Sequence, residues 1–219
     1  MQSTFFGDSE RLLKLVEILL QGAGVTLKIF ALTLVLSIPL GMLVSVGRMS
    51  RRWFVRGPVY VYIYVMRGTP LMLQILFIYF ALLKLCGMDR FPAVIIAFTV
   101  NYAAYFAEIF RGGILAVPRG QREAAQVLGY GKAQTFFRII LPQVIKNVIL
   151  PVTNEVITLV KDTALASTVA VAELMTLAKK QVTGSSSIEP YVVAILFYLV
   201  LNGLAEQACK FVERKLSYY

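Results

Sequence analysis

The chain has 219 residues, of which 58% are apolar and 16% charged, and its mean hydropathy is +0.72. This composition excludes an ordinary water-soluble domain, and because each membrane crossing takes about 20 residues, little length remains for a separate catalytic domain. The net charge of +10 lies in short basic blocks between apolar runs, which indicates membrane orientation and not nucleic-acid binding.

The amino-terminal residues 1–21 are predicted to form an amphipathic helix outside the membrane, at its surface. Their apolar positions repeat at helical spacing: Leu12, Leu15, Val16, Leu19 and Leu20. A helix with one apolar face lies in the plane of the interface, so we expect it to precede the first crossing.

Five apolar segments are long enough to cross a hydrocarbon layer of about 30 Å. They cover approximately residues 25–46, 59–83, 91–109, 144–160 and 191–209. The polar stretch 111–142 between the third and fourth segments is too charged to lie in lipid. The sequence therefore predicts an all-α integral membrane protein with residues 1–219 as a single transmembrane domain and five transmembrane helices.

The basic residues predict the orientation of these helices. Twelve Lys and Arg residues lie in segments 48–56, 111–138 and 210–215, against six in segments 11–14, 84–90 and 179–180. Because cytoplasmic loops carry the excess of Lys and Arg, the amino terminus is expected outside and the carboxyl terminus in the cytoplasm. An odd number of spans is consistent with that arrangement.

The cytoplasmic stretch contains GQREAAQVLGYGKAQTFFRIILP, which is predicted to form two short helices around a turn. The first opens with Glu123, Ala124 and Ala125, and the second begins near residue 132 and ends near residue 141. The small alanine side chains let this helix approach another surface closely, and Gly129 permits the reversal. The segment is therefore predicted to dock on a partner.

The spacing of this segment resembles the cytoplasmic motif of permease subunits of ABC importers: EAA, three residues, Gly129, nine residues, Ile139, one residue, Leu141 and Pro142. MRGTPLMLQ, NYAAYFAEIFRGGI and LVKDTALAS resemble recurrent segments of the branch that serves polar amino acids. The resemblance thus covers nearly the whole chain. One departure is Ala164, where that branch usually has Ser.

The resemblance implies a set of partners. In this family the loop is a coupling helix seated on an ATP-binding subunit, with Glu123, Ala124, Ala125 and Gly129 at the contact. The complex is expected to contain two ATPase subunits, a second permease chain that is identical or a close paralogue, and an extracytoplasmic solute-binding protein, in a prokaryotic cytoplasmic membrane. This chain has no G-x-x-x-x-G-K-[ST] phosphate loop, so ATP and Mg are expected in the partner, with no cofactor here.

Polar groups inside the fourth span are candidates for substrate contacts, because a charge at mid-membrane costs about 2.5 kcal/mol or more. Glu155 and Asp162 are seven residues apart, which places both on one helix face with Thr158 between them. Their carboxylates are expected to receive an α-ammonium group or a cationic side chain, and Thr163 follows in the same segment. The alternative is an internal network in which Asp162 pairs with Arg67 or Lys161.

The second span is predicted to break where Arg67, Gly68, Thr69 and Pro70 interrupt an apolar run. Arg67, Thr69 and the freed amides suit the substrate α-carboxylate, with an Arg67–Asp162 pair as the alternative. Asn101 in the third span suits a zwitterion, or an interhelical hydrogen bond. Glu108 and Arg111 are predicted to form a structural pair.

These features predict a permease subunit of an ATP-driven importer of polar amino acids, with a weak preference for basic ones because of Glu155 and Asp162. A secondary transporter or channel without an ATPase is the alternative. An intramembrane enzyme ranks last, because histidine is absent and only these two carboxylates remain as a catalytic pair.

Overall fold

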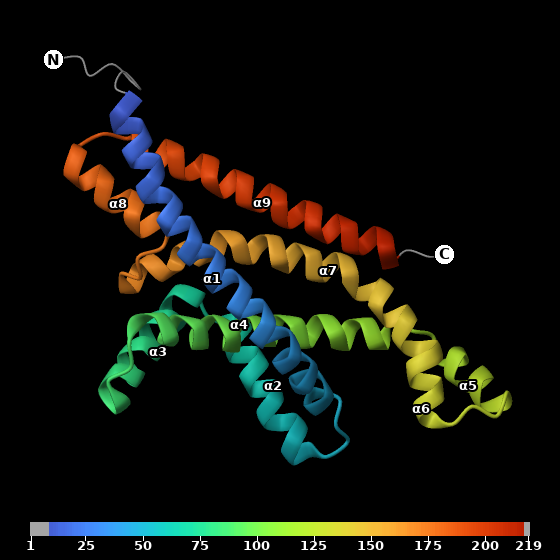
Figure 1. Ribbon diagram of the computed structural model, residues 1–219. Helices are drawn as coiled ribbons and strands as arrows, with labels where there is room; N and C mark the ends of the chain where they lie inside the picture. The colour runs from blue at the N-terminus through green and yellow to red at the C-terminus, as the bar shows by residue number, and fades with distance from the viewer. Residues whose placement is uncertain (1–8, 217–219) are drawn as a thin grey trace. The chain divides into compact units, whose positions relative to one another are not determined.

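The computed structural model describes residues 9–216, which are helical apart from short connections and contain no strand (Figure 1). The α-helices are α1 (Ser9–Arg48), α2 (Trp53–Gly68), α3 (Leu71–Cys86), α4 (Arg90–Leu115), α5 (Arg119–Val127), α6 (Lys132–Thr135), α7 (Leu141–Asp162), α8 (Leu174–Ser185) and α9 (Glu189–Leu216). A π-helix, η1 (Phe136–Ile140), precedes α7, and a 3₁₀ helix, η2 (Thr163–Val169), follows it.

Four helical stretches are long and apolar enough to cross a membrane. They are α1, α4, the continuous stretch Lys132–Val169 that contains α7, and α9. Helices α2 and α3 meet the same criterion only together, as a broken pair that makes a fifth crossing if it is one span. The predicted all-α membrane fold is confirmed, with four to five candidate spans.

The break in the second span is confirmed at the predicted position. Helix α2 ends at Gly68, and α3 begins at Leu71. Pro70 is the residue before the first turn of α3, where its missing N–H costs nothing because the first amides of a helix have no intrahelical acceptor. The proline thus ends one helix and begins the next.

Helix α1 differs from the sequence expectation, which had an amphipathic helix over 1–21 and a separate span over 25–46. The described part, Ser9–Arg48, is one helix of 40 residues, and residues 1–8 lie outside the described part of the chain. At 1.5 Å per residue this helix is about 60 Å long, twice the hydrocarbon thickness, so part of it extends beyond the bilayer core.

The described residues form two compact units. The first comprises residues 9–34, 69–99 and 157–205, and the second comprises 35–68, 100–156 and 206–216. The boundary runs through α1, α4, α7 and α9, so each unit is built from parts of several helices.

In the first unit, α8 packs against the first half of α1 and the start of α9 (Figure 1). The shared core consists of Leu15, Leu19, Leu174, Ala178, Val193 and Ala194. Gly22 makes the approach close, since a Cβ there would lie 2.9 Å from the Leu174 Cα. The Leu174 amide donates to Thr26 Oγ1 at 3.3 Å, which fixes the start of α8 on α1.

In the second unit, α4 is the central helix. Its residues Ala104 and Ala107 pack with Ile63 of α2, and small side chains allow this contact. Just after α4, Val117 packs with Ile140 of η1 and with Val144 and Val148 of α7, and Ile114 of α4 packs against this cluster. These contacts hold the ends of α2 and α7 against α4, where the polar residues described below gather.

The junction of α6 and α7 also differs from the sequence expectation of a short helix ending near 141. The helix continues through Pro142 into α7, because the preceding turn is a π-helix in which the Leu141 amide donates to the Phe136 carbonyl. The wider turn accommodates a proline that would otherwise break the hydrogen-bond ladder.

Candidate functional site

Arg67 lies in the last turn of α2 and is exposed. Its guanidinium carbon lies 5.2 Å from the ring centroid of Tyr105 on α4, a cation–π contact that orients the side chain without neutralising it. Arg67 therefore keeps its positive charge and its hydrogen-bond donors for a third group.

Glu108 is one turn further along α4 and is surrounded by arginines. The Arg111 Nη2 donates to Glu108 Oε2 at 2.6 Å, and the Arg111 Nε lies 3.0 Å from the same oxygen. The Arg48 Nε lies 3.8 Å from Glu108 Oε1, and the Arg48 guanidinium stacks over Tyr60 at 4.8 Å. The predicted Glu108–Arg111 pair is confirmed, and Arg48 extends it to the end of α1.

Two cavities meet at this cluster. One, of about 520 Å³, is lined by Arg48, Arg67, Arg111 and Glu108 together with tyrosines, so its charged wall carries three arginines and one glutamate. The other, of about 390 Å³, is lined by Arg67, Glu108 and Glu155, so its charged wall carries one arginine and two glutamates. Both cavities are lined by Arg67, Tyr105 and Glu108. Basic residues outnumber acidic ones in the first cavity, and acidic residues outnumber basic ones in the second.

Helix α7 contributes Glu155, Asn147 and Pro151 to the more acidic cavity. The Asn147 Nδ2 donates to the Gly113 carbonyl of α4 at 3.3 Å. Pro151 has no N–H to donate to the Asn147 carbonyl four residues earlier, which leaves that oxygen without its usual helical partner. The cavity wall thus combines a carboxylate and an amide side chain on one helix.

Two other predicted site residues hold helix ends in place. Asn101 is 3% exposed, and its Nδ2 donates to the Met66 carbonyl at 3.0 Å, next to Arg67. The predicted interhelical hydrogen bond is therefore present. Thr69, in the first unit, accepts a hydrogen bond from Gln74 Nε2 on its Oγ1 at 2.7 Å, which stabilises the start of α3.

The remaining predicted substrate contacts also lie in the first unit. Thr158 is exposed and Asp162 is half-buried at the end of α7. Thr163 is fully buried, and its hydroxyl donates to the Val160 carbonyl at 2.6 Å. The structure thus brings Arg67 and Glu155 together at one cavity, and the roles of Thr158, Asp162 and Thr163 stay predictions.

Sequence reasoning missed Tyr105 and Asn147 as lining residues and gave Glu108 a structural role alone. A signal was present: Tyr105, Glu108 and Gly112 are spaced by three and four residues, so they share one face of α4. The position of Asn147 gave no such signal, because its neighbours in the cavity come from other helices.

The predicted reversal after the EAA segment is built as a Schellman motif. Helix α5 ends at Val127, and Gly129 adopts φ = 78°. The Tyr130 amide donates to the Ala125 carbonyl and the Gly129 amide to the Gln126 carbonyl, each at 3.0 Å. A left-handed residue at this position closes the helix end, which is why glycine suits it.

Helix α5 presents most of its surface to solvent. Ala125 is buried, whereas Glu123, Ala124 and Gln126 are exposed, and Val127 and Leu128 are 88% and 73% exposed. Exposed apolar residues at the end of a short helix are typical of a surface that another protein covers. The contacts predicted for Glu123, Ala124, Ala125 and Gly129 stay predictions.

Comparison with known proteins agrees with this architecture. Residues 37–218 match the family described as "Binding-protein-dependent transport system inner membrane component". The arginine transport system permease protein ArtQ of Bacillus subtilis (strain 168) is 36% identical, over 92% of this chain and 94% of that protein. The L-cystine transport system permease protein TcyB of the same organism is 37% identical, over 92% and 88% of the two chains.

A solved structure, described as the crystal structure of an amino acid ABC transporter with histidines, is similar in fold as well as in sequence. It is 32% identical, with a TM-score of 0.87 over 98% of this chain and 100% of that chain. The resemblance to ABC importer permeases is confirmed. The chain belongs to the family of binding-protein-dependent transport system inner membrane components.

Proposed function

We propose that this chain is the transmembrane subunit of an ATP-driven importer of polar amino acids. The family supplies the class of transport, and the two relatives are named as permeases for arginine and L-cystine. The assignment to amino acids rests on the two cavities of the second unit that share Arg67, Tyr105 and Glu108. The charged residues of one cavity are mainly basic, and those of the other are mainly acidic.

An amino acid carries a carboxylate and an ammonium group on one carbon, so its site needs both signs of charge at short range. The cavity with three arginines suits the carboxylate, because guanidinium groups bind carboxylates in a bidentate manner. The cavity with Glu108 and Glu155 suits the ammonium group. Arg67 at their junction would contact the carboxylate, and Asn101 would position Arg67 through the Met66 carbonyl.

Basic amino acids are the favoured substrates within this class. Glu108 lies on α4 and Glu155 on α7, so the more acidic cavity carries carboxylates from two helices. One carboxylate is enough for the α-ammonium group of the substrate. A second carboxylate in the same cavity would suit a cationic side chain. The named substrates of the relatives include arginine and an uncharged amino acid, so the family alone does not decide this.

The partners follow from the family and from the surface of α5. We propose two ATPase subunits that bind ATP and Mg, a second permease chain, and an extracytoplasmic binding protein that delivers the amino acid. The amino terminus would lie outside a prokaryotic cytoplasmic membrane and the carboxyl terminus inside. ATP binding would move α5, and the ATPase cycle would alternate access to the cavities.

The proposal is tested by uptake of radiolabelled amino acids into proteoliposomes that contain this chain and its ATPase subunit and are supplied with the binding protein. Glu155→Gln is expected to lower uptake of arginine and lysine about tenfold or more, because a charge-assisted contact is lost. Uptake of glutamine is expected to fall much less. Glu206→Gln is the matched control, because Glu206 is an exposed glutamate that pairs with Lys210 on α9.

Equal loss for charged and uncharged amino acids in Glu155→Gln would contradict the preference for basic substrates. Uptake that continues without the ATPase subunit would contradict the importer itself and support a secondary transporter or channel. The two results are distinguishable, because the first is measured in vesicles with the ATPase subunit and the second in vesicles without it.

A further inference from the structure

A third cavity of the second unit lies between α5 and the helices that it adjoins, away from the charged cavities. Its volume is about 450 Å³, within the range of about 300–1,000 Å³ that is usual for small-molecule sites. Most of its wall is apolar and comes from the ends of α1 and α4 and from η1: Val46, Met49, Ile114, Phe136 and Ile140. Neither the transport pathway nor the surface of α5 proposed for the ATPase accounts for it.

The polar part of the wall is confined to α5, the turn after it and α6. Arg122 and Lys132 are both exposed and carry positive charge, and Gln126 and Tyr130 add uncharged hydrogen-bonding groups. Among residues 9–216, no acidic side chain lines this cavity. The site is therefore cationic at one part of its wall and apolar at the rest.

Two apolar residues of the cavity wall are also exposed. Val46 is 66% exposed and Phe136 is 39% exposed, and both line the cavity. Both belong to helical stretches that qualify as membrane spans, α1 and Lys132–Val169. An apolar chain that occupies the cavity would contact both residues.

We propose that this cavity binds an anionic phospholipid, with one acyl chain against the apolar wall and the phosphate held by Arg122 and Lys132. The charge selects the headgroup, since basic residues beside a span attract anionic lipids. The apolar wall selects a lipid over a free anion, because inorganic phosphate would leave it uncovered. The lipid would bridge α5 to the ends of α1 and α4 and so stiffen the base of the coupling segment.

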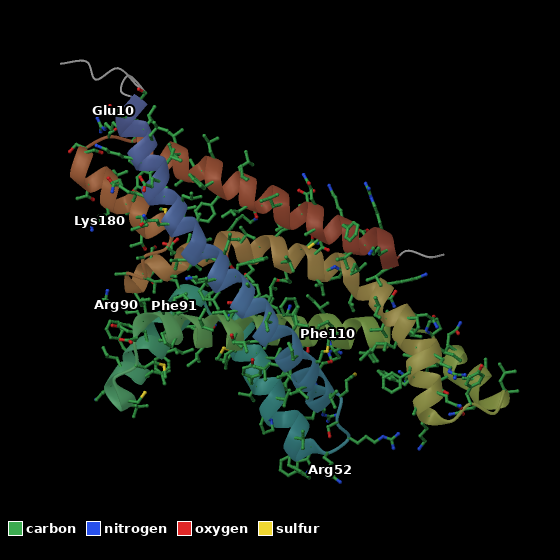
Figure 2. The ribbon with its side chains drawn as sticks, in the orientation of Figure 1. Glu10, Arg52, Arg90, Phe91, Phe110 and Lys180 are labelled. Carbon is green, nitrogen blue, oxygen red and sulfur yellow. The ribbon has the colours of Figure 1, made fainter. Side chains whose placement is uncertain are left out.

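The test uses the complex of this chain with its ATPase subunit, delipidated in detergent and titrated with phosphatidylglycerol or phosphatidylcholine. Bound lipid is measured by native mass spectrometry. Phosphatidylglycerol is expected to bind about tenfold more tightly than phosphatidylcholine, and Arg122→Gln with Lys132→Gln to abolish that difference. Arg51→Gln with Arg52→Gln is the matched control, since it removes the same charge from the α1–α2 connection, where Figure 2 shows Arg52.

A second pair of variants tests the acyl chain without changing any charge. Val46→Trp is expected to fill the cavity and to lower binding of both lipids, whereas Leu43→Trp, at a residue of α1 that is 70% exposed and does not line the cavity, is expected to leave binding unchanged. Assembly with the ATPase subunit, checked by size-exclusion chromatography, shows that each variant is folded.

Three results would overturn the proposal. Equal loss of phosphatidylglycerol in the two double variants would show a diffuse basic surface and not a site. Displacement of the lipid by an excess of inorganic phosphate would show that only an anion is bound. Absence of bound lipid from the assembled complex would show that the ATPase subunit occupies the cavity.

Discussion

Glu173 is a fully buried carboxylate at the start of α8, in the first unit. Its oxygens accept hydrogen bonds from the Met175 and Thr176 amides, each at 2.7 Å, and from the Thr176 hydroxyl at 2.8 Å. The Tyr198 hydroxyl of α9 donates to it at 3.1 Å. One side chain thus caps α8 and ties it to α9.

The protonation of Glu173 predicts a dependence of stability on pH. Burial raises the pKa of Glu173 above its ordinary value of 4.5, although the donated hydrogen bonds oppose this shift. A raised pKa in the folded state means that the folded protein holds this proton more tightly than the unfolded chain does. The contribution to stability is therefore complete below pH 4.5 and is lost as pH rises through the folded pKa.

We expect Glu173→Gln to gain thermal stability relative to the native protein as pH is raised from about 5 to about 8, because glutamine stays neutral. The measurement is the Tm of both proteins in detergent across this range, with Glu17→Gln, at an exposed residue of α1, as control. Two Tm curves that stay parallel over the whole range would contradict the assignment of the pH dependence to Glu173.

Residues of the candidate site were predictable from sequence where their own chemistry was unusual for a span. Arg67 and Glu155 are ionisable groups in apolar surroundings, and both line the same cavity. Tyr105 was not predicted, because a tyrosine in a membrane helix is common and its contact with Arg67 joins residues 38 positions apart in different helices, a distance in the chain that no local pattern encodes.

At the scale of helices, the predicted break before Pro70 is present, whereas the predicted separation of residues 1–21 from the span 25–46 is replaced by one continuous helix over Ser9–Arg48. Pro70 ends a helix because it has no N–H to donate and disfavours a helical conformation of the residue before it, and Gln74 Nε2 donates to Thr69 Oγ1 beside the new helix start. Gly22 leaves α1 intact, because its lack of a side chain serves close packing on α8. The sequence identifies a glycine but does not show whether that glycine breaks a helix or allows close packing.

Two neighbouring glycines of α1, Gly22 and Gly24, predict opposite effects of the same substitution. Gly22→Ala would place a Cβ 2.9 Å from the Leu174 Cα, and forcing α8 away is expected to cost about 1–3 kcal/mol. Gly24→Ala meets nothing within 4 Å and is expected to stabilise α1 by about 0.4–1 kcal/mol. Thermal unfolding of the two variants in detergent measures both, and shifts of the same sign would contradict the packing of α8 on α1.

At the scale of the whole molecule, apolar segment lengths and the EAA spacing predicted the membrane fold and the family, because bilayer thickness and a docking surface constrain sequence directly. The binding cavities were less predictable, since each is lined by side chains of several helices. The fold of this chain gives the exposed surface of α5 no packing role. A partner protein is therefore expected to constrain the residues on that surface.

The central claim is that α5 transmits the ATPase cycle to the membrane helices, and ATP-driven uptake in proteoliposomes tests it most directly. Glu123→Arg with Ala124→Trp changes two exposed residues of α5 and leaves the buried Ala125 in place. Glu206→Arg with Ala31→Trp makes the same changes at exposed positions of α9 and α1. We predict uptake at least tenfold lower in the α5 variant and unchanged in the control, and undiminished uptake in the α5 variant would contradict the account.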